Sequence, residues 1–432
     1  MNKPNQNIQK IAIIGMGYVG IPLCKSFLEA GIKVIGIDIC EKRIDELNKN
    51  KVTLNHLSKV NFDESLKNKD VRFSTNFQDC ELVDSILICV PTPLNEKMHP
   101  DLSCIRNVIS SVKPYIKKGQ TISLESTTYP GTTREEIVLP LEEKGMIAGN
   151  DFFVVYSPER EDPGNAKYNC KNTPKVIGGY TQNCLDKGVN LYSNVVDTLV
   201  EVSSCEVAEF TKLYENIYRA VNIGLANEMK IVADSFGIDI FEIIRAAATK
   251  PFGFSAFYPG PGVGGHCIPV DPEYLNWKAR ALGSESKLVD VALKVNREVT
   301  KFVIKKTLER LEENGKSISS SKILILGISY KSNIDDIRES PSLDIVRHLL
   351  KLNAEIFYDD KYVTPNSLGD ITNNVKRVSD STLTEENISM YDAILILTNH
   401  DYYNNENILM HGEIVVDTRG IFSSNEKNVV RG

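Results

Sequence analysis

The residues best suited to covalent chemistry lie in a stretch rich in glycine and proline, residues 259–272, Pro-Gly-Pro-Gly-Val-Gly-Gly-His-Cys-Ile-Pro-Val-Asp-Pro. This composition excludes a regular helix or a central strand and predicts a loop whose backbone closely approaches another group. Cys267 lies near its end, and the carboxylate of Asp271 follows four residues later. A thiol beside a potential base is typical of a covalent nucleophile. A tight turn around an inert cysteine fits this stretch equally well on its own.

A second glycine-rich segment, near the start of the chain, has the composition of a phosphate-binding turn. Gly15, Gly17 and Gly20 follow a short apolar run, residues 11–14, which is typical of a buried parallel strand. A helical pattern and a second apolar run come next, and that run ends at Asp38. This order predicts a dinucleotide site, with a pyrophosphate at the helix N-terminus and a carboxylate on the adenosine ribose.

The acid at position 38 favours NAD over NADP, because a carboxylate repels a 2′-phosphate. Arg43 weakens this preference, since a nearby arginine accepts a 2′-phosphate. Tyr18 and Val19 lie between the fingerprint glycines and are assigned to the cofactor with them.

Polar clusters follow three further apolar runs of this N-terminal part. Because ligands bind beyond the carboxyl ends of parallel strands, we expect the three clusters to converge on the cofactor. Each one alone is also compatible with an ordinary turn. The clusters are Pro91-Thr92-Pro93, then Thr127-Thr128-Tyr129-Pro130-Gly131, which follows Ser126 at the end of its apolar run, and Ser157-Pro158-Glu159-Arg160.

Residues 203–250 show a long helical period and no strand pattern. Lys212 and Asn216 lie four residues apart and therefore share one helix face. Such a pair is most often a solvated surface pair. The helical pattern returns over residues 272–314, which suggests an all-helical block suited to subunit contacts.

The C-terminal part repeats the beginning of the chain in degenerate form. Residues 322–330, Lys-Ile-Leu-Ile-Leu-Gly-Ile-Ser-Tyr, parallel residues 10–18, but Ser329 and Ser332 replace the second and third fingerprint glycines. We therefore predict a second α/β domain that binds a nucleotide other than NAD. Lys331 and Arg338 follow this strand and are candidates for holding a phosphate or another anion.

Composition narrows the function classes. Hydrophobic residues make up 42% and charged residues 25%, a balance typical of soluble globular proteins, and no apolar run is long enough to span a membrane. The net charge of −7 argues against nucleic acid as a partner. Nine scattered cysteines without a secretory signal predict reduced thiols in the cytoplasm, and no metal-ligand spacing is present, so we expect no metal.

Taken together, these motifs resemble the UDP-glucose/GDP-mannose dehydrogenase family, the nucleotide-sugar 6-dehydrogenases, over nearly the whole chain. The most specific motif is Gly264-Gly265-His266-Cys267-Ile268-Pro269-Val270-Asp271, and the family's Tyr-Lys-x-Asn-x-Asp-Asp-x-Arg-Glu-Ser segment is present at residues 330–340. The resemblance implies two Rossmann-like doubly wound α/β domains joined by a helical segment. The expected divisions are an NAD-binding domain (1–202), a central helical dimerisation domain with the cysteine loop (203–314) and a UDP-sugar-binding domain (315–432).

The resemblance also implies the reaction, a four-electron oxidation of sugar C6 to a carboxylate with NAD. The chain is similar to the branch acting on UDP-N-acetylhexosamines, with UDP-GlcNAc as the expected substrate and UDP-ManNAc, UDP-GalNAc or UDP-glucose as alternatives. A homodimer or higher homo-oligomer is expected. The implied catalytic residues are Cys267, Lys212, Asn216, Asp271, Glu159 and Thr127, and the implied substrate contacts are Glu159, Arg160, Lys212, Asn216, Tyr258, Gly264, His266, Lys331 and Arg338.

One position departs from the family pattern. The UDP-glucose branch has a second glutamate four residues after the first, and Pro163 occupies that position here, with Glu161 nearby. Two other functions stay open at this point. A two-electron NAD-dependent hydroxyacid dehydrogenase would need neither the cysteine nor the C-terminal domain, and a non-catalytic NAD sensor would leave the catalytic residues unexplained.

Overall fold

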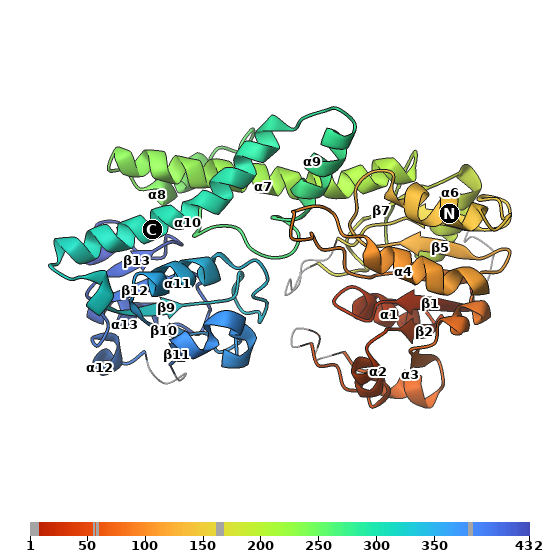
Figure 1. The fold of residues 1–432 in the computed structure, drawn as a ribbon, viewed down its shortest axis with the longest axis horizontal. Coiled ribbons are helices and arrows are strands. Elements are labelled where there is room, and N and C mark those ends of the chain that lie inside the picture. Colours follow the sequence, from red (N-terminus) through yellow and green to blue (C-terminus); the bar gives the residue numbers. More distant parts are fainter. Residues whose placement is uncertain (1–7, 55–56, 58–59, 161–167, 379–382) are drawn as a thin grey trace. The chain divides into compact units, whose positions relative to one another are not determined.

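The computed structural model describes residues 8–54, 57, 60–160, 168–378 and 383–432. The chain divides into two compact units, each built around one β-sheet (Figure 1). The first unit contains Met1–Glu215 and Glu273–Ser284. The second unit contains Asn216–Pro272 and Glu285–Gly432.

The sheet of the first unit has the strand order β3-β2-β1-β4-β5-β6-β7-β8. Strands β1 to β6 are parallel, as expected for a doubly wound domain, whereas β7 pairs with β6 in the antiparallel direction and β8 is parallel to β7. The strands are β1 (Lys10–Ile14), β2 (Lys33–Ile37), β3 (Val71–Ser74), β4 (Ser85–Ile88), β5 (Thr121–Leu124), β6 (Phe153–Tyr156), β7 (Lys175–Gly179) and β8 (Leu199–Val202).

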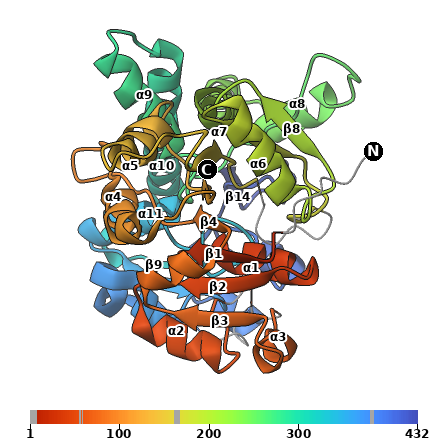
Figure 2. The same cartoon turned by 90° about the vertical axis from the view of Figure 1, so that its right-hand side faces the viewer.

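Helices cover this sheet, which is why its inner strands are apolar without alternation. Helix α1 packs on β1 and β2, and α2 packs on β3 (Figure 2). Burial of both faces of a parallel sheet requires continuous apolar runs such as that of β1, in which four of five residues are buried. The helices are α1 (Gly20–Glu29), α2 (Glu41–Asn48), α3 (Asp63–Lys67), η2 (Phe77–Leu82), α4 (Ser103–Val112), η3 (Lys113–Tyr115), the π-helix η4 (Arg134–Val138), α5 (Leu139–Glu142) and α6 (Gln182–Tyr192).

Four helices make up the predicted helical block, and no strand occurs between residues 203 and 314, all of which are described. They are α7 (Cys205–Ser235), α8 (Ile240–Ala247), α9 (Asp271–Ala281) and α10 (Lys287–Glu313). Helix α8 begins where the side chain of Asp239 accepts a hydrogen bond from Phe241 N. In the second unit, α10 packs along α11 (Pro341–Lys351).

The sheet of the second unit is fully parallel, with the order β11-β10-β9-β12-β13-β14. Successive residues of β9 enter two separate apolar clusters: Ile323 and Ile325 pack on one face, and Leu324 and Leu326 on the other. The elements are η5 (Ile318–Ser320), β9 (Lys322–Leu326), β10 (Glu355–Asp359), η6 (Pro365–Asn374), β11 (Val375–Arg377), α12 (Glu385–Ile388), β12 (Ala393–Ile396), α13 (Asn405–His411), β13 (Val415–Asp417) and β14 (Val429–Arg431). Within the described ranges, no helix is both long and apolar enough to cross a membrane.

Candidate active site

The three fingerprint glycines have different structural reasons for lacking a side chain. A β-carbon on Gly15, which has a φ of +96°, would come within 2.5 Å of Cys89 O, and one on Gly20 within 2.0 Å of Gly15 O. These two glycines therefore permit the tight turn and the close packing of α1 on β1. A β-carbon on Gly17 would meet no atom within 4 Å, so the backbone there is open to a ligand. This division fits a pyrophosphate resting on the N-terminus of α1.

Asp38 lies directly after β2, at the end where the ribose of a dinucleotide is expected. Its Oδ2 accepts hydrogen bonds from Met16 N (2.9 Å) and from Arg43 Nη1 (2.9 Å), and its Oδ1 accepts one from Cys40 N (2.9 Å). The carboxylate thus joins the glycine turn to the start of α2. Arg43 is held against this carboxylate and forms an ion pair with it.

The loops after β4 and β5 are joined by hydrogen bonds, as the strand-end clusters predict. Ser126 Oγ donates to Val90 O at 2.6 Å, and Thr92 Oγ1 donates to Thr127 O at 2.8 Å. Tyr274 also belongs to the first unit, and its hydroxyl donates to Thr92 O at 2.9 Å. Pro91 and Thr92 therefore lie beside Ser126 and Thr127 at the carboxyl edge of the sheet.

The third cluster, after β6, contacts the first part of α7. Lys212 Nζ donates to the backbone oxygen of Glu159, and Arg160 forms an ion pair with Glu215. Arg160 Nη1 also donates to Pro174 O at 2.7 Å. The structure therefore brings three predicted site residues of the first unit together: Glu159, Arg160 and Lys212.

A buried ion pair that the sequence analysis did not single out supports this loop. Lys175 Nζ donates to Glu125 Oε2 at 2.7 Å and to Ser157 O at 3.2 Å, and the Lys175 and Glu125 side chains are only 6% and 0% exposed. Burial alone would lower the pKa of Lys175, but the Glu125 carboxylate holds it above its ordinary value. The sequence feature that could have revealed this pair is Glu125, an acid directly after the apolar strand β5.

Glu209 is a second buried acid of the first unit, three residues before Lys212 on α7. Its carboxylate accepts hydrogen bonds from Gly131 N (2.6 Å), Thr133 N (2.8 Å) and Thr133 Oγ1 (2.7 Å). Burial raises the pKa of Glu209 to about 7, although these hydrogen bonds oppose the shift. Glu209 thereby fixes α7 to the loop that continues from Thr127.

In the second unit, the glycine-rich loop before Cys267 lies directly against the segment that follows β9. A β-carbon on Gly264 would come within 2.5 Å of Tyr330 Cβ, and one on Gly265 within 3.0 Å of the Tyr330 ring. Gly265 N donates to Arg338 O at 2.9 Å, and a β-carbon on Gly262 would come within 2.8 Å of Pro341 Cβ. The group that these glycines approach closely is therefore the protein's own residue 330–341 segment.

The beginning of the same loop is held by two buried polar residues of α7. Asn227 Oδ1 accepts a hydrogen bond from Gly260 N (3.0 Å), and Lys230 Nζ donates to Gly260 O (3.0 Å). Burial lowers the pKa of Lys230 to about 7. The sequence analysis did not single out Lys230, because a lysine on a long helix is normally solvated.

Cys267 is partly buried and lies beside the polar side chain of His266. Its Sγ lies 3.5 Å from His266 Nε2. Asp271 N donates to Cys267 O at 2.8 Å, which forms the turn from which α9 begins. The Asp271 carboxylate is 3% exposed and accepts a hydrogen bond from the Asn216 amide, which is 2% exposed. The Asn216 oxygen in turn accepts a hydrogen bond from Arg219.

The predicted anion-binding residues of the second unit differ in their surroundings. Arg338 is exposed, and its guanidinium donates to both carboxylate oxygens of Asp336, from Nη2 to Oδ2 (2.6 Å), from Nε to Oδ1 (2.9 Å) and from Nε to Oδ2 (3.1 Å). Lys331 is partly buried on the same segment. Tyr258 is 50% exposed, and its ring stacks on Phe241 with a centroid distance of 6.5 Å.

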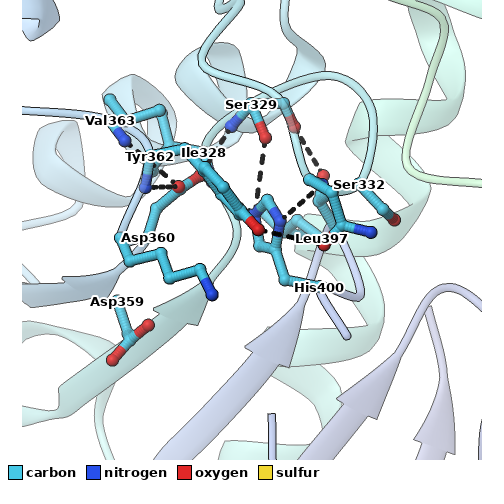
Figure 3. Close-up of polar contacts among 12 residues, drawn as sticks. Ile328, Ser329, Ser332, Asp359, Asp360, Tyr362, Val363, Leu397 and His400 are labelled. Carbon is cyan, nitrogen blue, oxygen red and sulfur yellow. Dashed lines mark hydrogen bonds and ion pairs between the residues drawn. The ribbon is translucent and has the colours of Figure 1, made fainter. Parts of the chain in front are cut away.

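A buried polar network holds the beginning of the 330–341 segment (Figure 3). Asp360 Oδ2 accepts hydrogen bonds from Ile328 N (2.9 Å) and Ser329 N (3.0 Å) and lies 3.2 Å from His400 Nε2. His400 Nδ1 accepts a hydrogen bond from Asn333 N at 2.9 Å, which leaves Nε2 to carry the proton and donate to Asp360. Asp360, His400 and Ser329 are at most 1% exposed, so the network is structural support for the segment that carries Lys331.

Two predicted features cannot be placed. Glu161 and Pro163, which decide whether a second carboxylate lies in this region, fall outside the described residues.

Among the residues that the structure describes, no cluster of His, Cys, Asp and Glu side chains suits a metal ion.

The chain matches the UDP-glucose/GDP-mannose dehydrogenase family along three segments. Residues 9–196 match its NAD binding domain, residues 206–298 its central domain and residues 324–424 its UDP binding domain. These segments include every site residue discussed above.

Relatives and solved structures agree with this match. The chain is 35% identical to Protein CapL of Staphylococcus aureus, covering 98% of both chains, and 32% identical to the UDP-N-acetyl-D-glucosamine 6-dehydrogenase of Pseudomonas aeruginosa, covering 94% of both. The solved UDP-D-ManNAc dehydrogenase of Pyrococcus horikoshii matches with a TM-score of 0.87 at 30% identity, covering 98% of both chains. The chain therefore belongs to the UDP-glucose/GDP-mannose dehydrogenase family and is an NAD-dependent nucleotide-sugar dehydrogenase, an oxidoreductase.

Proposed function

We propose that this enzyme oxidises the C6 hydroxyl of a UDP-N-acetylhexosamine to the carboxylate through a covalent intermediate on Cys267. The observation that carries the proposal is the arrangement at the end of the glycine-rich loop. Cys267 lies there with its Sγ 3.5 Å from His266 Nε2, and its backbone oxygen accepts a hydrogen bond from the N–H of Asp271, whose buried carboxylate is hydrogen-bonded to Asn216. A nucleophile keeps the intermediate aldehyde attached between two hydride transfers, which a four-electron oxidation requires.

UDP-GlcNAc is the proposed substrate. The motif residues His266 and Val270 are similar to those of the branch acting on UDP-N-acetylhexosamines, and the run from Thr249 to Gly262 is similar to that of UDP-N-acetylglucosamine 6-dehydrogenases. Relatives named for UDP-N-acetyl-D-glucosamine and for UDP-N-acetyl-D-mannosamine are matched at similar identity. UDP-ManNAc, UDP-GalNAc and UDP-glucose therefore belong in the test beside UDP-GlcNAc.

NAD, when bound, accepts the hydride from C6. The residues proposed to hold it are the open backbone at Gly17 with its neighbours in the turn, Asp38 beside the ribose, and the joined loops after β4 and β5. In full, these are Gly15, Gly17, Tyr18, Val19, Gly20, Asp38, Arg43, Pro91, Thr92, Ser126 and Thr127.

Lys212 and Asn216 are proposed to stabilise the oxygen that becomes negative when the C6 hydroxyl loses its proton. They lie one turn apart on α7, so their side chains share one face of that helix. A cation and an amide N–H are both suited to an oxyanion. The nucleotide part of the substrate is assigned to Lys331 and Arg338 of the second unit, with Glu159, Arg160, Tyr258, Gly264 and His266 as further substrate contacts.

In the second half of the reaction, the Cys267 thiolate adds to the aldehyde carbon and forms a thiohemiacetal. Loss of a second hydride from that carbon leaves a thioester, and water hydrolyses it. Glu159 or Asp271 is proposed to take the proton from this water, and Thr127 to orient it. Asp271 suits the role of base because its buried carboxylate is held in place by Asn216.

We further propose that the enzyme works as a homodimer or higher oligomer in the cytoplasm. Helix α7 exposes Tyr218, Leu225, Met229 and Val232, each at least 37% exposed, with a spacing of three, four or seven residues. Such an apolar stripe fits a second copy of the same helix. No disulfide joins any of the nine cysteines, all of which lie in the described residues, and this is compatible with a reducing compartment.

The test is the amount of NADH formed per UDP-sugar consumed, measured by absorbance and chromatography with the four UDP-sugars. About two NADH per sugar, with UDP-GlcNAc as the best substrate, is the expected result. Cys267→Ser should abolish formation of the acid. About one NADH per sugar, or full turnover to the acid by Cys267→Ser, would refute the covalent route.

A further inference from the structure

The 3.5 Å contact between Cys267 Sγ and His266 Nε2 places a potential base on the nucleophile itself. A distance of this size is within hydrogen-bonding range for a sulfur atom. His266 is exposed at the surface of the described chain, whereas Cys267 is partly buried. The imidazole is therefore accessible to solvent protons while its Nε2 faces the thiol.

Asp336, an acid of the neighbouring segment, interacts electrostatically with the same imidazole. Burial of Asp336 works toward a higher pKa, but the hydrogen bonds from Arg338 outweigh it and hold the pKa of Asp336 below its usual range, and His266 adds to this lowering. Asp336 is thus a carboxylate at any pH near neutrality. A stable negative charge close to an imidazole favours its protonated form.

The backbone of the two segments is held in register, which keeps these groups together. Gly265, the residue before His266, donates its N–H to Arg338 O at 2.9 Å. Gly264 and Gly265 both pack on Tyr330. Two further charged residues of these segments have partners of their own: Arg338 is paired with Asp336, and Asp271 is hydrogen-bonded to Asn216.

From this geometry we propose that His266 is a catalytic residue that takes the proton of Cys267, so that the resting enzyme holds a thiolate–imidazolium pair with Asp336 as the partner of the imidazolium. The part of this inference that concerns the reaction rests on the proposed function. When the thiolate sulfur bonds to the aldehyde carbon, the carbonyl π bond breaks, and the oxygen takes the proton from His266. His266 accepts that proton again when the carbon loses its second hydride to NAD.

The experiment follows alkylation of Cys267 by iodoacetamide in the full-length protein as a function of pH, quantified by mass spectrometry of the Cys267 peptide. In the unmodified enzyme, the rate should stay high at about pH 6.5. In His266→Gln, the rate at that pH should fall about tenfold or more, and the profile should move toward that of an ordinary thiol, half-ionised near about pH 8.5. His266 is exposed, so this substitution is compatible with folding.

His99→Gln is the matched control, because His99 is an exposed histidine of the first unit that packs near Trp277. Its profile should equal that of the unmodified enzyme. Asp336→Asn should move the profile in the same direction as His266→Gln, by a smaller amount. The proposal is overturned if His266→Gln and His99→Gln give the same profile. Because alkylation needs neither sugar nor NAD, this readout stands even if no UDP-sugar is oxidised.

Discussion

The two Rossmann-like turns of this enzyme share a backbone plan and differ in what fills it. Each has a glycine at positive φ directly after the first strand of its sheet, Gly15 after β1 and Gly327 after β9. Each glycine donates its N–H to the last residue of the neighbouring strand, at 2.8 Å to Ile37 O and at 3.0 Å to Asp359 O. Each turn is also bound by an acid that follows that neighbouring strand, Asp38 or Asp360.

The difference lies in the space in front of the turn. In the first unit, Gly17 leaves that space open. In the second unit, Ser329 occupies the corresponding position, and His400 fills the space beside it and donates to Asp360 (Figure 3). The comparison shows that the acid after the neighbouring strand, Asp38 or Asp360, has a structural role in both units, because it accepts hydrogen bonds from backbone N–H groups of the turn. Only where the turn is open can it also serve a cofactor.

The largest effect expected from this comparison is that of removing Asp360. Asp360→Ala leaves four backbone N–H donors, those of Ile328, Ser329, Tyr362 and Val363, without their carboxylate, and also removes the partner of His400. We expect the free energy of unfolding of the second unit to fall by about 4 kcal/mol. Hydrogen exchange of the β9 amides, measured by mass spectrometry, reports this loss directly.

Asp38→Ala is the matched variant in the first unit. It removes only two backbone hydrogen bonds and a partly exposed arginine pair, so a smaller loss of about 2 kcal/mol is expected, together with a loss of NAD affinity in calorimetry. The single tryptophan, Trp277, lies in the first unit and reports its unfolding by fluorescence. If Asp360→Ala and Asp38→Ala lowered the free energy of unfolding equally, the larger structural role assigned to Asp360 would be wrong.

The second prediction sharpens the comparison at the glycines. Gly327→Ala places a β-carbon within 2.4 Å of Thr398 O at a φ of +87°, so we expect a loss of about 3 kcal/mol in the free energy of unfolding. Gly17→Ala meets no atom within 4 Å, so its stability should change by less than about 1 kcal/mol. Its NAD affinity should nevertheless fall at least about tenfold, because the methyl group occupies the space expected for the pyrophosphate. Thermal denaturation and NAD titration of both variants separate the two effects, and normal NAD affinity in Gly17→Ala would argue against this site.

Much of the fold was predictable because buried parallel strands are short apolar runs. Residues 11–14 were expected as a buried strand, and β1 is Lys10–Ile14. Strands β7 and β8 were not predicted, since β7 contains two glycines and β8 has a charged residue at Glu201. The antiparallel direction of β7 relative to β6 depends on long-range pairing, which no local pattern encodes.

The candidate site was predictable where its residues share one motif or one helix. Cys267 and Asp271 lie in one short motif, and Asn216 was singled out from its spacing on α7. The close approach of Gly264 to Tyr330 was not predictable, because the two residues are far apart in sequence and meet only in the folded unit. The sequence alone predicted only that the glycine-rich loop approaches some other group closely, and did not identify that group.

The third prediction concerns acid. Burial of Asp360 works toward a higher pKa, but the hydrogen bonds from His400, Ser329 N and Ile328 N hold the pKa of Asp360 below its usual range. Below about pH 4, the unfolded chain therefore takes up a proton that the folded unit excludes, and stability falls as the pH falls. Asp360→Asn removes this titration. In urea denaturation, the difference in the free energy of unfolding between the unmodified enzyme and Asp360→Asn should become smaller as the pH is lowered. A difference that does not change with pH would contradict the low pKa assigned to Asp360.

The smallest effect is expected when the second turn is made to look like the first. Ser329→Gly restores the second fingerprint glycine and loses the hydrogen bond from Ser329 Oγ to Lys331 O (3.0 Å), at a cost of about 1 kcal/mol. We expect no new NAD site, because His400 still fills the space and the Asp360 oxygens still accept the backbone N–H groups. Calorimetric titration should show the same number of NAD sites per chain as the unmodified enzyme. A second binding event in Ser329→Gly would mean that the serine alone closes the turn, and that the buried His400 and Asp360 do not.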